Sequence, residues 1–219
     1  MILAKGTYFV TGIDTGIGKS VSTGMLARLL AEQGASVITQ KFIQTGCGGF
    51  SEDIEVHRKI MGIGMQPCDL DRTTASAVFE FPASPHLAAR LENRKVDLAG
   101  IEAATRRLAA MYDVVLIEGA GGLMVPIEGF YTAADYVAEN DLPVIIVTSG
   151  RLGSINHTLL TMEACRSREI PLAALVFNRW PEGNPVITAD TLDYLHRYME
   201  CFYPGVPLIE IPVIEHFEQ

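Results

Sequence analysis

The sequence predicts an α/β fold: a doubly wound, mostly parallel sheet with helices on both faces. Apolar runs of strand length alternate along the chain with segments whose apolar residues recur at helical spacing. The runs DVVLIEG (113–119) and LPVIIVTSG (142–150) are continuously apolar, as is typical of parallel strands that are covered on both faces. No linker, repeat or low-complexity tract divides the 219 residues, so we expect one domain over residues 1–219.

The first predicted unit is a strand, a glycine-rich turn and a helix. An apolar run at 7–11 leads through GIDTGIGKS (12–20) into a helix at 21–34. Glycines let the turn adopt left-handed backbone angles and point its N–H groups at an anion, and the helix N-terminus adds positive charge. We expect Lys19 to reach terminal phosphates and the Ser20 hydroxyl to bind Mg²⁺. The loop is one residue longer than the usual phosphate loop, and the alternative is a glycine turn that only caps the helix.

The rest of the first half contains a second strand and three helices. SVITQKF (36–42) has the composition of a buried strand, and the least periodic region, 62–85, contains a strand-like VFEF at 78–81. Helices are predicted at 51–61, with Ser51 as N-cap, at 84–94 and at 97–111.

The second half alternates regularly. Strands are predicted at 113–119, 142–150, 171–178 and 207–212, and helices at 132–139, 154–168 and 187–201. In such sheets ligands bind outside the carboxyl ends of the strands. Polar residues or glycines follow each of the main strands, so one rim is expected to carry the phosphate loop, Lys41 and Thr45, EGAGG (118–122), 151–156 and Asn178.

Charge and cysteine spacing argue against several classes of protein. The chain has 17 Lys and Arg against 26 Asp and Glu, a net charge of −9 without a basic run, which disfavours non-specific binding to nucleic acid or anionic membranes. The four cysteines show no metal-binding spacing. The first residues show no export signal, and the apolar runs are too short to span a bilayer. We therefore expect a cytoplasmic protein.

Five segments together resemble the dethiobiotin synthetase family. They are GIDTGIGKS (12–20), KFIQTG (41–46), SPH (84–86), EGAGGLMVP (118–126) and RLGSINHTLLT (151–161). The resemblance implies a single P-loop ligase domain that uses ATP and Mg²⁺ to close the ureido ring of dethiobiotin, in biotin biosynthesis, from 7,8-diaminononanoate and CO₂. One amine would become a carbamate, the carbamate would take the γ-phosphoryl group to give a carbamic-phosphoric anhydride, and the second amine would displace phosphate.

The resemblance also assigns the site residues. Lys41 and Lys19 would be catalytic, with Lys41 facing the carbamate and the γ-phosphate. Mg²⁺ would be held by the oxygen ligands of Ser20, Asp53 and Glu118. ATP would be bound by Gly16, Ile17, Gly18, Lys19, Ser20, Val21, Asp53, Glu118, Gly119, Ala120, Gly121, Asn178, Arg179, Pro212, Val213 and Ile214. The diamine would be bound by Thr15, Thr45, Gly153, Ser154, Ile155 and Asn156.

The resemblance implies a subunit interface and a role for the glycines of residues 118–122, and the chain departs from the family pattern at Phe42. The segment 153–156 would reach across an interface to hold the substrate carboxylate of the other subunit, so a homodimer with shared active sites is expected. Phe42 follows Lys41, where the family usually has proline. The glycines of EGAGG (118–122) would let the backbone approach the ligand closely.

Plain structural alternatives exist for the charged residues. Glu118 could be a salt-bridged structural carboxylate, Asp53 an acid favoured by the helix dipole, and Lys41 an ordinary solvated lysine. His57 has no partner pattern in the sequence.

Two other functions fit a phosphate loop. A partition or Min-type ATPase would carry an extra lysine where Ile13 and Asp14 stand, and an Asp-x-x-Pro-Gly turn where EGAGG (118–122) stands. An amidotransferase-type ligase would need a glutaminase domain with a nucleophilic cysteine, for which the residues after Asn178 leave no room.

Overall fold

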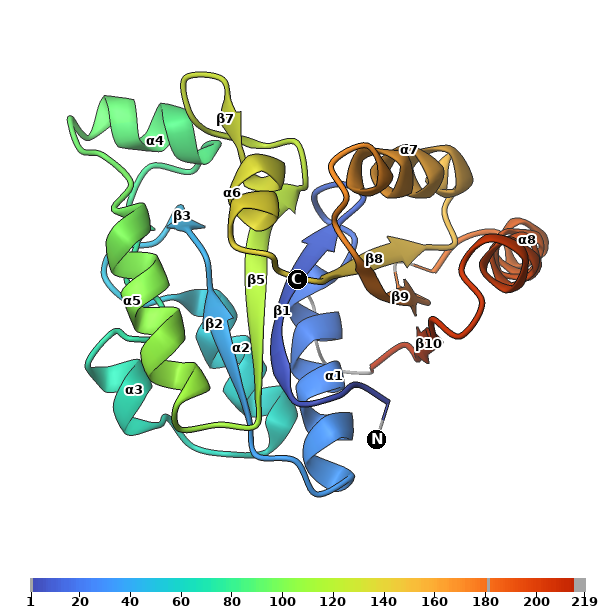
Figure 1. Cartoon of the computed structure of the whole chain (residues 1–219), viewed down its shortest axis with the longest axis horizontal. Helices are drawn as coiled ribbons and strands as arrows, with labels where there is room; N and C mark the ends of the chain where they lie inside the picture. Colours follow the sequence, from blue (N-terminus) through green and yellow to red (C-terminus); the bar gives the residue numbers. More distant parts are fainter. Residues whose placement is uncertain (1, 181, 215–219) are drawn as a thin grey trace.

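A six-stranded sheet forms the centre of the computed structural model, which describes residues 2–180 and 182–214 (Figure 1). The strand order is β10-β9-β8-β1-β5-β2, and all neighbouring strands in it run parallel. The six strands are β1 (Gly6–Gly12), β2 (Val37–Lys41), β5 (Val114–Gly122), β8 (Val144–Ser149), β9 (Leu172–Asn178) and β10 (Leu208–Ile211). The predicted fold class is confirmed.

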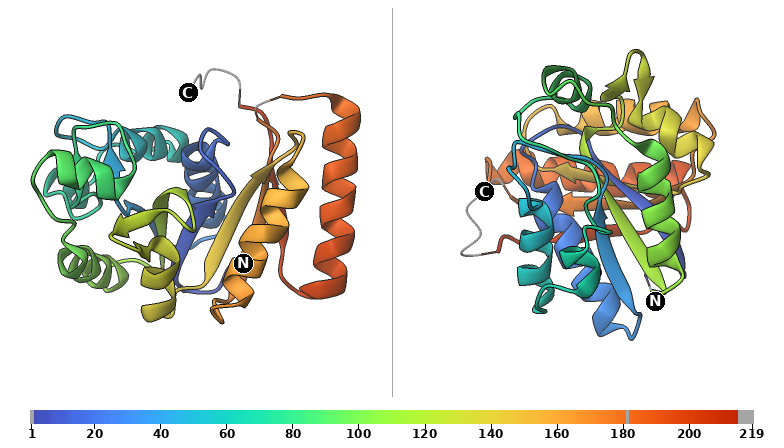
Figure 2. Two further views of the ribbon diagram at one scale, coloured as in Figure 1. Left: turned by 90° about the horizontal axis from the view of Figure 1, so that it is seen from above. Right: turned by 90° about the vertical axis from the view of Figure 1, so that its left-hand side faces the viewer.

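The pleat of the strands divides the apolar side chains between two cores. On β1, Phe9 faces one core, whereas Tyr8 and Val10 face the other. The Phe9 side is covered by α5 (Leu98–Ala109), α6 (Ala133–Glu139), α7 (Ser154–Arg166) and α8 (Pro185–Phe202), and the opposite side by α1 (Lys19–Glu32) with α2 (Glu52–Met61) packed against it. Figure 2 shows helices on both sides of the sheet. This is the two-faced burial that continuously apolar strands require.

Capping residues set several helix boundaries where they were expected. The Ser51 side chain accepts the N–H of Ile54 at the start of α2, which ends at Gly62 with φ 70°. At the start of α6, Thr132 and Asp135 form a reciprocal capping box. The helix predicted at 84–94 is shorter, α4 (Pro85–Leu91), and is followed by Asn93 at φ 52°.

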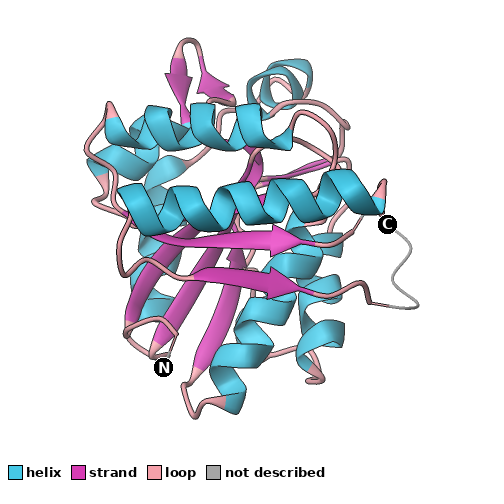
Figure 3. Cartoon of the chain, turned by 90° about the vertical axis from the view of Figure 1, so that its right-hand side faces the viewer, coloured by secondary structure: helices cyan, strands magenta, loops and turns pink. Residues whose placement is uncertain are grey.

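The longest described helix, α8, lies over the strands at the β10 edge of the sheet (Figure 3). Leu195 and Met199 are buried in the core, whereas Asp193 and Arg197 are exposed on the opposite face. The helix is therefore amphipathic. Throughout the described part of the chain, no helix combines the length and apolarity needed to cross a membrane.

The described residues include five short elements, of which the sequence indicated only β4 (Val78–Phe79), within the strand-like segment 78–81. Helix α3 (Pro67–Leu70) lies in the aperiodic region, β3 (Gln44–Thr45) pairs in parallel with β4, and β6 (Pro126–Glu128) pairs antiparallel with β7 (Tyr131–Thr132). Elements of two to four residues are too short for a periodic pattern to be read from the sequence.

A buried ion pair holds α3 against α2. The Arg58 guanidinium donates from Nε and Nη2 to the two carboxylate oxygens of Asp69, at 2.8 and 2.7 Å, and both residues are at most 2% exposed. Asp69 also accepts the Gln66 N–H and the Thr74 hydroxyl, each at 2.7 Å. Burial would raise the pKa of Asp69, but the hydrogen bonds from Arg58, Gln66 and Thr74 together hold it below its ordinary value.

We predict that Asp69→Asn destabilises the protein by about 3–5 kcal/mol at neutral pH, because it leaves a buried guanidinium without its counter-charge. The folded-state pKa of Asp69 lies below its unfolded value, so the stabilisation is present above about pH 4 and is lost as pH falls through the folded pKa. Urea denaturation of the variant should therefore show a smaller decline in stability at acid pH than the wild type.

Asp193→Asn is the matched control for this substitution. Asp193 pairs with Arg197 on the surface of α8, where the two side chains are 67% and 66% exposed, so its loss should change stability by less than about 0.5 kcal/mol. Equal stability of Asp69→Asn and the wild type at pH 7 would contradict the structural role of the buried pair.

Candidate active site

The loop between β1 and α1 has the backbone of an anion-binding turn. Gly16 and Gly18 take φ values of 64° and 75°, and Gly18 is the N-cap of α1. A Cβ on Gly18 would lie 2.1 Å from the Nδ2 of Asn178, so no larger residue fits there. Lys19 and Ser20 open the first turn of α1, where the N–H groups and the helix dipole favour a phosphate.

Asn178 tethers this loop to the end of β9. The side chain is buried, its Nδ2 donates to the Ile17 carbonyl at 2.8 Å, and its Oδ1 accepts the Trp180 N–H at 3.2 Å. Asn178 is one of the residues predicted to bind ATP. The structure shows both ends of its amide engaged within the protein, at a position that holds the phosphate loop.

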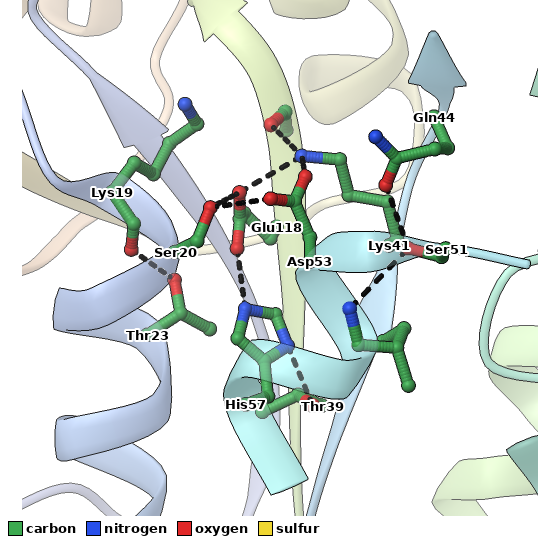
Figure 4. Close-up of polar contacts among 12 residues, drawn as sticks. Lys19, Ser20, Thr23, Thr39, Lys41, Gln44, Ser51, Asp53, His57 and Glu118 are labelled. Carbon is green, nitrogen blue, oxygen red and sulfur yellow. Dashed lines mark hydrogen bonds and ion pairs between the residues drawn. The ribbon is translucent and has the colours of Figure 1, made fainter. Parts of the chain in front are cut away.

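Four predicted residues meet beside the loop (Figure 4). The Ser20 hydroxyl lies 2.7 Å from Asp53 Oδ1 and 2.9 Å from Glu118 Oε1. The Lys41 ammonium forms ion pairs with Asp53 and, at 2.8 Å, with Glu118 Oε1. We call Ser20, Lys41, Asp53 and Glu118 the Lys41 cluster. Each member comes from a different element: α1, β2, α2 and β5.

Strand register places Lys41 opposite Glu118. The two residues are partners in the β2–β5 ladder, and the Phe42 N–H donates to the Glu118 carbonyl at 2.8 Å. The Phe42 ring packs against Phe9 and Tyr136, with ring centroids 5.3 and 4.6 Å apart. A proline at position 42 would lack that N–H, so the departure from the family pattern adds a hydrogen bond beside Lys41.

The glycines after Glu118 have internal reasons to be glycine. A Cβ on Gly119 would lie 2.8 Å from the Phe9 ring, and Gly121 has φ 72°. The expectation that these glycines serve only the approach of a ligand is therefore incomplete, because packing of β5 on β1 already requires Gly119.

The cluster is charged and largely closed to water. Burial would lower the pKa of Lys41, which is 5% exposed, but the carboxylates of Glu118 and Asp53 raise it above its ordinary value. Burial would raise the pKa of Glu118, but Lys41 and His57 hold it well below its usual range. The lysine is thus a fixed cation and the glutamate a fixed anion. The structural reading of Glu118 as a salt-bridged carboxylate is correct for this state, and Lys41 is not an ordinary solvated lysine.

Lys19 has the opposite electrostatic environment. Burial lowers the pKa of its ammonium, although Glu118 and Asp53 act in the other direction. Within the described residues its ammonium has no ion-pair partner, and it lies apart from the network of contacts in Figure 4. An anionic ligand on the loop would supply the missing counter-charge.

His57 was missed as a member of the site. It is fully buried, its Nε2 lies 2.6 Å from Glu118 Oε2, and its Nδ1 lies 2.9 Å from the Thr39 hydroxyl. The sequence held one usable signal, because His57 follows Asp53 by one helical turn and therefore lies on the same face of α2.

The oxygen donors of the cluster fit Mg²⁺. One hydroxyl lies within hydrogen-bond distance of two carboxylates, so three hard oxygen ligands converge on one point. No group of three or more His, Cys, Asp or Glu side chains in the described ranges is arranged to hold a metal ion by itself.

The residues predicted to bind the diamine are more dispersed. Thr15 is exposed, and Thr45 is half-buried after β2. The segment 153–156 opens α7, and β1 and β5 separate it from Lys41 in the sheet order. Ser154 is buried. Its N–H donates to the Arg151 carbonyl, and its hydroxyl lies 3.2 Å from that of Ser149. Gly153 and Asn156 are exposed on the rim.

One hollow lies beside the phosphate loop, and the lining of a second includes a residue that directly follows β9. A groove of about 420 Å³ runs between the loop, the turn after β5 and α7, and its lining includes Ile13, Leu123, Met124, Leu160 and Thr161. This groove was not predicted. A cavity of about 590 Å³ lies beyond β9, and its lining includes Arg179, Thr188, His196 and Val213. Of the residues predicted to bind ATP, Arg179 and Val213 line the cavity, while Pro212 and Ile214 flank Val213 in sequence.

Comparison with known proteins gives a consistent family. A family model described as an AAA domain matches residues 6–214. The ATP-dependent dethiobiotin synthetase BioD 2 of Pasteurella multocida is 50% identical over 90% of this chain and 93% of its own. The BioD 2 of Haemophilus influenzae is 55% identical over 80% of this chain and 91% of its own. The ATP-dependent dethiobiotin synthetase BioD of Chlorobaculum tepidum is 50% identical over 94% of this chain and 84% of its own.

Solved structures support the fold alone. A plasmid partition protein from Borrelia burgdorferi superposes with a TM-score of 0.57, at 15% identity over 98% of this chain and 93% of that chain. A ParA family ATPase from Chlorobium tepidum superposes with a TM-score of 0.54, at 18% identity over 97% of this chain and 86% of that chain.

The phosphate loop, the charged cluster beside it and these sequence relationships lead to one conclusion: the chain belongs to the family of ATP-dependent dethiobiotin synthetases, which are ligases of biotin biosynthesis.

Proposed function

We propose that this protein uses ATP and Mg²⁺ to close the ureido ring of dethiobiotin on 7,8-diaminononanoate and CO₂. The observation that carries the proposal is the Lys41 cluster, which sets a fixed cation and three oxygen ligands beside a phosphate-binding loop. Family membership supports the same reaction.

The reaction divides into three bond-forming steps. One amine nitrogen attacks the carbon of CO₂ and loses a proton to water, which gives a carbamate. A carbamate oxygen then attacks the γ-phosphorus and ADP leaves, which gives the carbamic-phosphoric anhydride. Finally, the second amine attacks the carbamate carbon and loses a proton to water, the bond to the phosphate oxygen breaks, and inorganic phosphate leaves as the ring closes.

Lys41 is suited to stabilise negative charge and unsuited to accept a proton. The raised pKa of its ammonium keeps it charged, so it would act on the carbamate and γ-phosphate oxygens as a fixed cation. Lys19, whose ammonium lacks a counter-charge within the described residues, would bind the terminal phosphates. The two lysines therefore divide the anionic groups of the reactants between them.

Ser20, Asp53 and Glu118 would hold Mg²⁺, since their oxygens already converge. When bound, the ion would neutralise charge on the phosphates. The loop from Gly16 to Val21 would bind the phosphates, and the cavity lined by Arg179 and Val213 would receive the base. For Ala120 and the other residues predicted to bind ATP, contact with the nucleotide remains a prediction.

The diamine would lie in the groove between the phosphate loop and α7. Its lining is mainly apolar, which suits a chain of methylene groups, and Thr15 lies at the exposed turn of the loop. Large apolar side chains flank the groove and are exposed, including Leu160 at 60% and Leu152 at 82%. We propose that this face forms a homodimer in which residues 153–156 complete the partner's site.

The proposal includes a cytoplasmic enzyme of one domain that does not bind nucleic acid. All four cysteines are free thiols, as is usual in a reducing compartment. The net charge of −9 disfavours binding to polyanions.

Leu160→Asp should convert the protein from dimer to monomer in sedimentation velocity experiments and reduce its activity, because it places a charge in the proposed apolar interface. Leu70→Asp is the matched control, since Leu70 is 67% exposed on α3, away from this face. A wild-type protein that is an active monomer would refute the shared-site dimer.

Lys41→Ala should leave binding of a non-hydrolysable ATP analogue close to that of the wild type and reduce turnover by about 10²–10³-fold, because the ammonium acts on charge that develops in the transition state. Calorimetry and steady-state kinetics would measure the two effects. Lys95→Ala, at a side chain that is 85% exposed, is the control. Parallel loss of binding and turnover would argue against this role.

The reaction itself is tested by phosphate release from MgATP in bicarbonate buffer. We expect release to depend strongly on 7,8-diaminononanoate, and mass spectrometry should detect dethiobiotin. If the rate of phosphate release does not depend on the diamine, the phosphate loop would still be a nucleotide site, but the ligase function would be refuted. That result would favour a partition-type ATPase.

A further inference from the structure

The two oxygens of the Glu118 carboxylate have separate partners. Oε1 accepts from Lys41 at 2.8 Å and lies 2.9 Å from the Ser20 hydroxyl, on the side of the phosphate loop. Oε2 lies 2.6 Å from His57 Nε2, on the side of the protein interior (Figure 4). One oxygen therefore faces the reactants while the other is anchored.

The contacts around Thr39 determine which nitrogen of His57 carries the proton. Arg58 can only donate, and its Nη1 lies 2.7 Å from the Thr39 hydroxyl oxygen. The hydroxyl accepts this bond and has one hydrogen of its own, for which His57 Nδ1 lies in reach at 2.9 Å. If Nδ1 accepts that hydrogen, Nε2 bears the ring proton and donates it to Glu118. In this arrangement every polar hydrogen among these groups has an acceptor.

The chain of contacts ends in a rigid support. Arg58 is held by Asp69 in a bidentate pair, and Arg58 Nη2 also donates to the Thr39 carbonyl at 3.3 Å. The hydrogen-bonded series Asp69, Arg58, Thr39, His57, Glu118 thus runs from α3 to the Lys41 cluster. All five residues are at most 2% exposed, so water does not compete for these bonds.

We propose that His57 is a positioning residue for the proposed Mg²⁺ ligand Glu118: as the neutral Nε2–H tautomer, set by Thr39 and Arg58, it holds Oε2 and keeps Oε1 directed at the metal. This inference rests on the metal role of Glu118 in the proposed function. A neutral donor orients the carboxylate without cancelling its charge, as outer-shell groups do at other metal sites. Both ring nitrogens of His57 are already engaged, so it does not itself contact the reactants.

The first test is the tautomer of the wild-type protein. NMR of ¹⁵N-histidine-labelled protein should show His57 as the tautomer that is protonated on Nε2 and unprotonated on Nδ1. Thr39→Val, which removes the hydroxyl, should change this signature, and Thr39→Ser, which keeps it, should not. A wild-type ring protonated on Nδ1 would overturn the inference, and this measurement does not depend on any activity.

The second test is metal affinity, measured by electron paramagnetic resonance of Mn²⁺ with a non-hydrolysable ATP analogue. His57→Leu should weaken Mn²⁺ binding by about 10–100-fold, the range typical of lost outer-shell partners. His57→Gln, whose side-chain amide can still donate to Oε2, should retain most of the affinity. Urea denaturation of both variants separates a metal effect from loss of folding.

Glu118→Gln separates the failure of this inference from that of the proposed site. If Glu118→Gln binds Mn²⁺ as the wild type does, Glu118 is not a ligand and both proposals fall. If Glu118→Gln loses affinity while folded His57→Leu keeps it, the metal site stands and the role of His57 is wrong. If phosphate release ignores the diamine while His57→Leu weakens Mn²⁺ binding, the ligase function falls and the role of His57 stands.

Discussion

The arrangement of this protein depends on a carboxylate that the central sheet carries into the interior. Glu118 lies in the buried part of β5 and is inaccessible to water, so its charge has to be balanced by protein groups. Those groups come from three other elements: Ser20 from α1, Lys41 from β2 and His57 from α2. Satisfying one buried charge therefore fixes how two helices and two strands meet at the rim of the sheet.

The two lysines of the site illustrate how position changes the chemistry of one side-chain type. Lys41 lies between two carboxylates, which raise its pKa and hold its ammonium in place. Lys19 is desolvated at the start of α1 without an ion-pair partner in the described residues, and its pKa falls. A preformed ion pair keeps one cation fixed beside the site, and the other cation is matched to the anion that the loop is shaped to bind.

The same fold serves other chemistry in the plasmid partition protein and the ParA family ATPase that superpose on this chain at 15% and 18% identity. A shared fold therefore does not separate a ligase from a partition ATPase. In the proposed ligase, the residues that follow the strands, such as Lys41 and the turn after Glu118, and the groove beside α7 would face the ligand.

The sequence alone was sufficient for the fold class and the main strands and helices, because apolar periodicity is a local property that a linear pattern records. The strand ends also indicated Lys41 and Glu118, whereas Asp53 was assigned to the Lys41 cluster only through the resemblance to a known family. It could not show that Asn178 ties down the phosphate loop, that Gly119 packs against Phe9, or that His57 anchors Glu118. Each of these contacts joins residues that are distant in sequence, and their partners are chosen by strand order and register. Of the two short strand pairs, only β4 was indicated by the sequence, since each of these strands is stabilised by its partner more than by its own pattern. Local chemistry thus determined which residues could act, and tertiary packing decided which of them share a hydrogen bond, because burial allows a polar group only the partners that the fold brings within reach.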